Sequence, residues 1–388
     1  MKKLLLILCL LYSTVLLAQS VQTGAEQFSI YIPILQDKRV GVVANHTSII
    51  GDKHLVDLLL EYKINVVRIF APEHGFRGTA DAGEKLNTTE DAQTGLEIVS
   101  LYGKNYKPTA EQLRDIDCIV FDMQDVGTRF YTYLSTMHYV MEACAENEIP
   151  FIILDRPNPN GFYVDGPILE NSFSSFVGLH PIPIVHGMTL GELAFMINSE
   201  GWLSNDLGCD LTVISCSGYS HKLSYQLPVP PSPNLPNQQS IYLYPSLCLF
   251  EGTVVSLGRG TDFPFQVFGH PALKANYDFS FTPQSVSGAK NPPLKDELCY
   301  GVDLRNFSEK ELTTSENIRL EWLLEAYQNF PQKEKFFNSF FYKLCGTESL
   351  RKQIEKGLSA EEIRASWQPA LNEFKQVRKF YLLYEDFE

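Results

Sequence analysis

The stretch "DCIVFDMQD", residues 117–125, decides the fold class of this 388-residue chain. Four apolar residues follow one another without alternation, and acids and an amide come directly after them. A short continuous apolar run is typical of a strand that is buried on both faces of a parallel sheet. The stretch therefore predicts a central parallel strand with polar side chains at its carboxyl end.

Three similar runs surround this one in the N-terminal half, and helical patterns separate them. The predicted strands are residues 39–45, 65–72, 117–125 and 150–159, and the predicted helices are residues 54–63 and 131–147. Strands that alternate with helices form right-handed βαβ units and a parallel sheet. The sequence therefore predicts an α/β fold for its N-terminal half.

The proline-rich stretch "LPVPPSPNLPN", residues 227–237, should be extended and irregular, and we place a domain boundary near it. This gives an N-terminal domain over residues 19–239 and a C-terminal domain over residues 240–388. In the second part, strand-like runs cover residues 252–258 and 298–307, and helical patterns cover residues 315–330 and 359–367. The C-terminal part is therefore predicted to be a smaller α+β domain.

Residues 1–18 have the pattern of a secretory signal peptide. Lys2 and Lys3 precede an apolar run, and Ala18 ends a small cleavage site. A retained membrane anchor is the alternative, because the run is only slightly shorter than a membrane span. The first interpretation predicts an exported protein, periplasmic or secreted, without stable membrane insertion after the signal is removed.

Net charge argues against two classes of partner. Removal of the two lysines changes the formal net charge from −14 to −16. A negative field of this size disfavours nucleic acid and anionic membranes as partners. It leaves room for a small anionic substrate if arginines gather in one cleft.

The seven cysteines after the signal are scattered and include no CxxC pair, so they predict neither a disulfide framework nor a zinc site. Most are expected in the core. A bridge between Cys209 and Cys216 remains open.

Polar residues follow three of the predicted strands. They are Glu73, His74 and Arg77; then Asp122, Gln124, Asp125 and Arg129; then Asp155, Arg156 and Asn158. Each group alone is also common in structural turns. Because the carboxyl ends of parallel strands meet at one edge of the sheet, together they predict a binding site there.

Two later segments are candidates for the other wall of a cleft. In "VHGMTLGELA", residues 185–194, His186 precedes a helix whose Thr189 and Glu192 have capping-box spacing, so we interpret Glu192 as a cap. In "FEGTVVSLGRGTDFPF", residues 250–265, the polar residues Glu251, Arg259 and Thr261 lie among glycines, which let backbone approach a ligand. A pair of hairpin turns is the alternative for this segment.

Several cofactor motifs are absent from the sequence. The first predicted strand leads into "NHTSIIG" rather than GxGxxG, so no dinucleotide cofactor is expected, and neither HExxH nor GxSxG occurs. A metal bound by Glu73, His74 and Asp122 is an alternative that we do not adopt. We predict no cofactor and no metal.

Acid pairs beside a bound sugar are the chemical groups that glycoside hydrolysis needs. Glu73 is the leading acid, and Asp122, Asp125 and Glu251 are the candidates for its partner. Tyr131, with Phe76, Phe130 and Phe265, could stack on sugar faces, although aromatic residues at such positions are equally often core. A sugar-binding protein without catalysis remains the alternative.

Five segments, in order, resemble the NamZ family of exo-β-N-acetylmuramidases, which was formerly a domain of unknown function. They are "APEHGFRG", "FDMQDVGTRFYTYLSTM", "LDRPNPNG", "HGMTLGELA" and "FEGTVVSLGRGTDFPF". The resemblance runs from about Val40 to the C-terminus. It implies a Rossmann-like N-terminal domain, a smaller C-terminal domain and an active site in the cleft between them.

The resemblance also implies the release of N-acetylmuramic acid from the non-reducing ends of peptidoglycan fragments, with Glu73 as the catalytic glutamate. Val254 and Leu257 replace polar residues of the family's usual "FEGTNVSEGRGT". Muramic acid carries a lactyl carboxylate, so a cationic partner is expected in the cleft. The candidates are Arg77, Arg129, Arg156 and Arg259.

Overall fold

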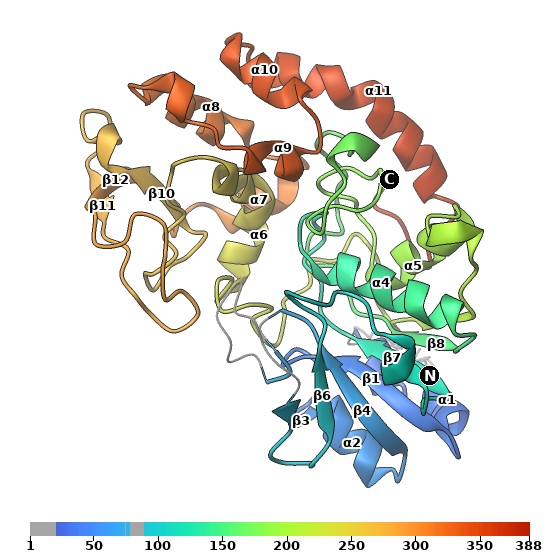
Figure 1. Cartoon of the computed structure of the whole chain (residues 1–388). Helices are drawn as coiled ribbons and strands as arrows, with labels where there is room; N and C mark the ends of the chain where they lie inside the picture. The colour runs from blue at the N-terminus through green and yellow to red at the C-terminus, as the bar shows by residue number, and fades with distance from the viewer. Residues whose placement is uncertain (1–20, 74, 78–88) are drawn as a thin grey trace, which may run out of the picture.

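The computed structural model describes residues 21–73, 75–77 and 89–388 (Figure 1). The predicted signal peptide and His74 lie outside the described residues, so both remain predictions. In the described ranges no helix is long and apolar enough to cross a membrane.

A seven-stranded sheet forms the centre of the N-terminal part, with the strand order β5-β6-β4-β1-β7-β8-β9. The strands are β1 (Arg39–Ala44), β4 (Asn65–Ala71), β5 (Thr89–Glu90), β6 (Glu97–Ser100), β7 (Cys118–Asp122), β8 (Phe151–Leu154) and β9 (Leu211–Ile214). All neighbours pair in parallel except β5 and β6. The predicted parallel α/β sheet is therefore confirmed, with β5, β6 and β9 as strands that the sequence pattern did not predict.

Helices cover both faces of this sheet (Figure 1). They are α1 (Phe28–Leu35), α2 (Leu55–Glu61), α3 (Ala110–Leu113), α4 (Tyr133–Glu146) and α5 (Leu190–Ser199), and a small hairpin adds β2 (Ile49–Ile50) and β3 (Lys53–His54). Neighbouring strand residues belong to different cores. Val120 packs in the cluster of α1 and α2, and Phe121 packs in the cluster of α4 and α5. Burial on both sides explains why β7 is a continuous apolar run up to Asp122.

The C-terminal part combines helices with a small antiparallel sheet, as predicted. Its strands are β10 (Val267–His270), β11 (Phe279–Phe281) and β12 (Cys299–Asp303). Its helices are α6 (Gln238–Leu247), α7 (Glu309–Thr314), α8 (Leu320–Asn329), α9 (Phe340–Cys345), α10 (Ser349–Glu355) and α11 (Ala360–Arg378). The predicted strand at residues 252–258 is wrong: this segment follows a 3-10 turn and makes only isolated bridges at Thr253 and Ser256.

The two parts share one hydrophobic core. Phe341 of α9 and Trp367 of α11 belong to the same buried cluster as Met137 of α4. The end of the chain also returns to the N-terminal part, where the Tyr384 hydroxyl donates to Asp155 at 2.6 Å. Figure 1 shows α11 leading back to the region of α5. The parts are thus packed against each other, and the boundary at residue 239 remains a prediction.

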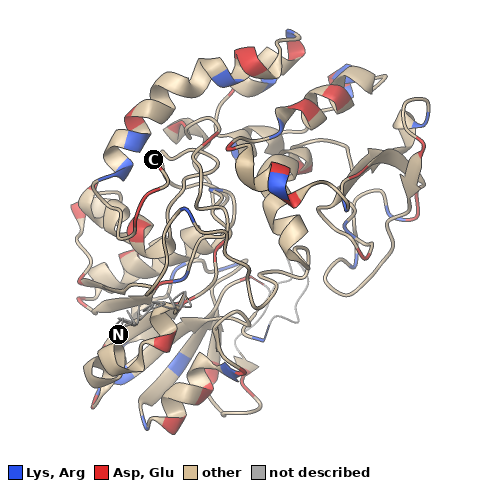
Figure 2. Ribbon diagram, turned by 180° about the vertical axis from the view of Figure 1, so that it is seen from behind, with Lys and Arg blue, Asp and Glu red and all other residues tan. Residues whose placement is uncertain are grey.

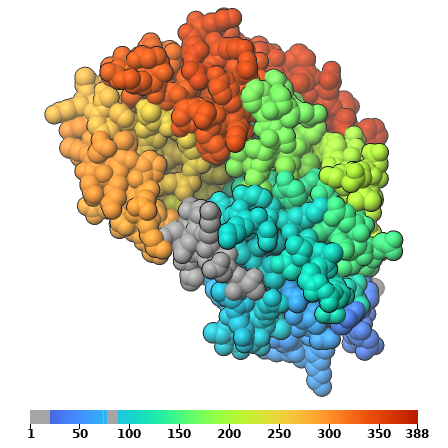
Figure 3. Space-filling view, in the orientation of Figure 1, coloured from blue at the N-terminus to red at the C-terminus, as the bar shows by residue number. Residues whose placement is uncertain are grey.

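The molecular surface shows where these parts leave a recess. Figure 3 shows one face hollowed between the N-terminal part and the yellow-to-red C-terminal part. Figure 2 shows acidic and basic residues interspersed over the ribbon seen from behind. All seven cysteines among the described residues are free and buried, including Cys209 and Cys216.

Candidate active site

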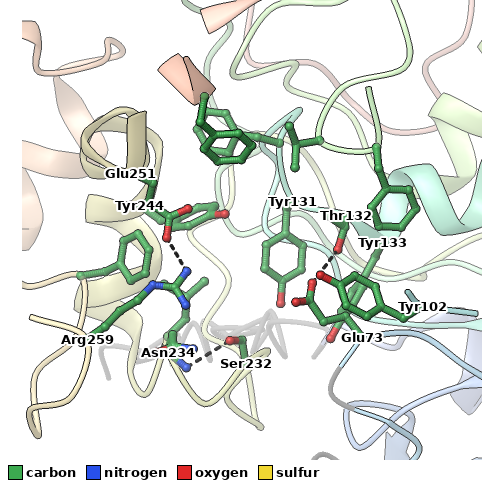
Figure 4. A pocket seen from close by; sticks show the side chains of 16 residues that line it. Glu73, Tyr102, Tyr131, Thr132, Tyr133, Ser232, Asn234, Tyr244, Glu251 and Arg259 are labelled. Carbon is green, nitrogen blue, oxygen red and sulfur yellow. Dashed lines mark hydrogen bonds and ion pairs between the residues drawn. The ribbon is translucent and has the colours of Figure 1, made fainter. Parts of the chain in front are cut away.

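A pocket lies where segments of both parts meet (Figure 4). Its volume is about 210 Å³, counted as the space that the centre of a water-sized sphere can reach. Its charged lining residues are Glu73, Glu251 and Arg259. Figure 4 shows the two glutamates on opposite sides, with the Tyr131 ring between them. The pocket therefore brings together a carboxylate from each part of the chain.

Glu73 stands two residues beyond β4, directly after Pro72, which has no N–H with which to extend the strand. Thr132, the N-cap residue of α4, donates its hydroxyl to Glu73 Oε2 at 3.5 Å. Tyr102 follows β6 and lines the same wall; burial and the Glu73 carboxylate raise the pKa of its hydroxyl. Three neighbouring elements thus position this side of the pocket.

Glu251 and Arg259 form an ion pair on the opposite wall. The Arg259 guanidinium also lies 5.2 Å from the centre of the Phe265 ring. Burial alone would lower the pKa of Arg259, but the Glu251 carboxylate raises it. The pair places one cation at the pocket, and about a quarter of each side chain remains exposed.

Aromatic side chains make up most of the remaining lining. They are Tyr102, Phe130, Tyr131, Tyr133, Phe176, Tyr244, Phe265 and Phe340. The hydroxyls of Tyr131 and Tyr133 both donate to the Pro231 carbonyl, at 2.9 and 3.2 Å. The proline-rich segment, predicted only as a boundary, therefore forms part of the pocket wall and adds Ser232 and Asn234 to it.

Of the predicted site residues, Glu73, Tyr131, Glu251 and Arg259 line this pocket. Phe130 and Phe265 line it as well, whereas Phe76 packs against His54 in the core. Sequence reasoning missed Tyr102, Thr132, Tyr133, Ser232, Asn234 and Tyr244. Ser232 and Asn234 lie between prolines, a signal that could have indicated them; Tyr102 follows a strand that was not predicted, and Tyr244 lies within α6.

Asp122 and Arg156 lie in the interior as a bidentate ion pair. Arg156 Nε and Nη2 donate to the two Asp122 oxygens at 2.5 and 2.9 Å. Asp122 is fully buried and Arg156 is 5% exposed, and neither lines the pocket. The structure gives this pair a role inside the fold, because each charge can be buried only next to the other.

Asp125, Gln124 and His186 are also buried, and none of them lines the pocket. Asp125 Oδ2 accepts from the Gly127 N–H at 2.6 Å, and Gln124 donates to the Pro157 carbonyl at 2.8 Å. Gly127 has φ +78°, and a Cβ there would collide with the Asn158 side chain. His186 Nε2 lies 4.0 Å from Asp125 Oδ2. Burial raises the pKa of Asp125 to about 7 and lowers that of His186 to about 3.

Replacing Asp125 by Asn should weaken the pH dependence of stability. The folded pKa of Asp125, about 7, exceeds the unfolded value of about 3.9, so folding binds a proton between these values and the free energy of unfolding falls as pH rises through this window. An amide keeps the bond from Gly127 and never ionises. From pH 5 to pH 8, the free energy of unfolding of the wild type should fall by about 2–3 kcal/mol more than that of the variant. Urea unfolding at both pH values measures this difference. Equal pH dependence in both proteins would contradict the assignment.

The remaining predicted site residues that the structure describes make contacts within the protein. Asp155 accepts hydrogen bonds from Thr189, Gly191 and Tyr384, and Asn158 donates to the Met188 carbonyl. Arg129 donates to the carbonyls of Pro167, Ile182 and Leu344. Arg77 pairs with Asp91, and Thr261 donates to the Gly258 carbonyl. None of these five lines the pocket. The capping box predicted for Thr189 and Glu192 is confirmed.

Hydrogen bonds join the segments that follow β1 and β7, at the crevice where such sheets bind dinucleotides. The strand order reverses between β1 and β7, and ligands of open α/β sheets bind at that point. Here Ser48 donates to the Asp122 carbonyl, and the Gln124 N–H donates to Thr47 at 3.0 Å. Across the described ranges no group of three metal-ligating side chains comes together.

Comparisons with known proteins identify the family of this chain. Residues 40–239 and 242–384 match the N- and C-terminal family models of exo-β-N-acetylmuramidase NamZ. The peptidoglycan β-N-acetylmuramidase NamZ of Bacillus subtilis (strain 168) is 40% identical over 384 residues, which cover 94% of this chain and 91% of that protein.

Two crystal structures of DUF1343 family proteins from Bacteroides fragilis NCTC 9343 are similar throughout. One is 53% identical with a TM-score of 0.88, and the other is 32% identical with a TM-score of 0.77. Each match covers 94% of this chain and 99% of the other. The chain therefore belongs to the NamZ family of exo-β-N-acetylmuramidases, a family of glycoside hydrolases.

Proposed function

We propose that this protein releases N-acetylmuramic acid from the non-reducing end of peptidoglycan fragments. The observation that carries the proposal is the pair Glu73 and Glu251, which face each other across an aromatic pocket beside Arg259 (Figure 4). Two carboxyl groups on either side of a sugar can divide the work of glycosidic cleavage. The family membership and the Bacillus subtilis relative support the same activity.

Glu73 protonates the oxygen of the glycosidic bond in this proposal. It lies on the wall formed by Tyr102 and Thr132, away from the cation. Glu251 is the second carboxylate. Arg259 holds it in place, so it can support the positive charge that develops on the sugar in the transition state.

Arg259 binds the lactyl carboxylate of the substrate. Of the four arginines that the sequence offered, Arg77 pairs with Asp91, Arg129 donates to backbone carbonyls and Arg156 pairs with Asp122. Arg259 alone among these four lines the pocket. A guanidinium has five donors in a planar fork, so it can keep Glu251 and accept a second carboxylate.

Replacing Arg259 by Gln should make the enzyme lose its preference for muramyl substrates. A hydrogen bond to a charged group contributes about 1.5–3 kcal/mol, so KM for 4-nitrophenyl β-N-acetylmuramic acid should rise at least about tenfold. KM for the lactyl-free 4-nitrophenyl β-N-acetylglucosamine should hardly change. Initial rates at varied substrate concentration measure both values.

The matched control is Arg39→Gln, which breaks an exposed ion pair with Asp117 at the start of β1. It should leave both KM values unchanged. An equal rise for both substrates in the Arg259 variant would contradict the carboxylate assignment.

The activity itself is tested by release of 4-nitrophenol from 4-nitrophenyl β-N-acetylmuramic acid by the wild type. Steady release with many turnovers is expected. Saturable binding of the same compound without any release would contradict the proposal and would favour a sugar-binding protein on this scaffold.

A further inference from the structure

A second cavity, of about 400 Å³, lies along α4 beyond the candidate active site. We call it the α4 cavity. Its lining comes from α4, from the loop before His180 and from the segment after α5, and includes His138, Tyr139, Asn171, His180 and Trp202. The proposed hydrolysis uses none of these residues.

The inner wall of the α4 cavity is a buried polar network. His180 and His138 are 2% and 7% exposed, and their rings share a hydrogen bond of 3.0 Å. Burial lowers the pKa of both imidazoles, so both are neutral near pH 7. Trp202 stacks on His180, with ring centres 5.2 Å apart. The wall therefore presents neutral hydrogen-bonding groups next to an aromatic face.

Glu142 supplies the acidic part of this wall. Burial alone would raise its pKa, but hydrogen bonds from Lys107 and Ser204 outweigh that effect and lower it to about 2. Lys107 is itself shared between Glu142 and Glu146. With one lysine between two carboxylates, this end of the cavity has no surplus of positive charge.

Aromatic rings connect the α4 cavity to the candidate active site. Tyr102 and Phe176 line the active-site pocket, with ring centres 6.0 Å apart. Phe176 in turn lies 6.3 Å from Tyr139, which lines the α4 cavity, and Tyr106 packs against both rings. Thr132 and Tyr139 are seven residues apart on one helix, a distance of about 10 Å. A short saccharide could therefore touch both sites at once.

The connection begins on the side from which the leaving group must depart. An acid that protonates the glycosidic oxygen lies at the scissile bond, and the protonated oxygen departs with the leaving sugar. Figure 4 shows Glu73 next to Tyr102, and this is also the side of Phe176. The leaving saccharide thus starts at the aromatic connection and points along it.

We propose that the α4 cavity, reached over Phe176 and Tyr139, binds the leaving saccharide at a neutral N-acetylhexosamine unit. The inference rests on the proposed function, because it assigns a neutral unit that lies farther along the leaving saccharide than the sugar at the cleaved bond. Aromatic faces pack against sugar rings, and the imidazole pair and Asn171 offer donors and acceptors to hydroxyl and amide groups. An anionic stem peptide fits less well beside Glu142 and Glu146.

The test compares two substrates. Tyr139→Ala should lower kcat/KM about tenfold, mainly through KM, for a tetrasaccharide that begins with N-acetylmuramic acid. For 4-nitrophenyl β-N-acetylmuramic acid, whose leaving group ends before the α4 cavity, the change should be less than twofold. Ser174→Trp, which fills the cavity from its exposed rim, should give the same difference.

The matched control is Tyr62→Ala, another partly exposed tyrosine, which packs on Phe28 far from both cavities along the chain. Its kcat/KM for each of the two substrates should equal that of the wild type. Equal losses on both substrates in Tyr139→Ala and Ser174→Trp, or no loss on either, would overturn the inference.

A binding measurement separates this inference from the proposed function. Calorimetric titration of Glu73→Gln with the tetrasaccharide should give a Kd about ten times lower than that of Glu73→Gln/Tyr139→Ala. If the wild type cleaves nothing but this ratio holds, the proposed hydrolysis fails and the saccharide site stands. Equal Kd values for the two proteins would overturn the site even in an active enzyme.

Discussion

Glu73→Gln should lower kcat/KM for muramyl substrates by about 10³-fold. An amide has the shape of the carboxyl group but cannot give a proton to the glycosidic oxygen, and a positioned acid contributes about 10²–10⁴-fold. Glu73 lies at the pocket surface, so the folded structure should persist. Steady-state rates with the tetrasaccharide measure the loss, and circular dichroism confirms the fold.

The matched control is Glu97→Gln on β6, where the carboxylate pairs with Arg68 and is not part of the pocket lining. Its rate should stay within about twofold of the wild type. Activity that survives Glu73→Gln would contradict the assignment of Glu73 as the acid, and Glu251 would be the next carboxylate to replace.

Asp122→Asn should lower the free energy of unfolding by about 3–5 kcal/mol. The substitution leaves the Arg156 guanidinium buried without its counter-charge, and breaking a buried pair on one side costs about this much. Urea unfolding measures the loss. The specific activity of the folded fraction should stay within about threefold, because Asp122 does not line the pocket.

The double variant Asp122→Asn/Arg156→Met is the control for this assignment. Removing the guanidinium as well should restore most of the lost stability, since a buried ion pair and apolar residues of similar size are often nearly equivalent. A stable Asp122→Asn protein without activity would instead restore Asp122 to the catalytic candidates.

The sequence predicted the central strands because each is buried on both faces. β1, β7 and β8 contain continuous runs of buried residues, and β4 is apolar except for Asn65 and Arg68. β6 and β9 were missed because each has only four residues and is only partly buried, so neither contains a long apolar run. Strand 252–258 was predicted wrongly, because valines between glycines resemble a strand while the backbone follows the turn at Gly258, where φ is +72°.

The candidate site was predicted only in part, because several of the polar residues pair with one another inside the protein. Polar residues after parallel strands do meet at one edge, and Glu73 was found by this rule. The rule cannot tell which of them pair with one another. Asp122 with Arg156 and Asp155 with Tyr384 are satisfied inside the protein, and Tyr384 is 229 residues away from its partner. Such pairings depend on tertiary contacts that local patterns do not contain.

The aromatic wall was the least predictable feature. Tyr102, Tyr244 and Phe340 come from three distant segments, and each has the composition of ordinary core sequence. The role of Pro231 was equally unpredictable, because it depends on the hydrogen bonds that its carbonyl accepts from the hydroxyls of Tyr131 and Tyr133. What decides the pocket is the packing of the C-terminal part on the sheet, which follows from the shared core.

The central claim is the removal of N-acetylmuramic acid from a non-reducing end. Two isomeric β-1,4 disaccharides test it most directly: one with N-acetylmuramic acid at the non-reducing end, and one with the same two sugars in reverse order. Mass spectrometry of the products should show cleavage of the first and none of the second. Cleavage of both at similar rates, or of the reversed isomer alone, would contradict the account.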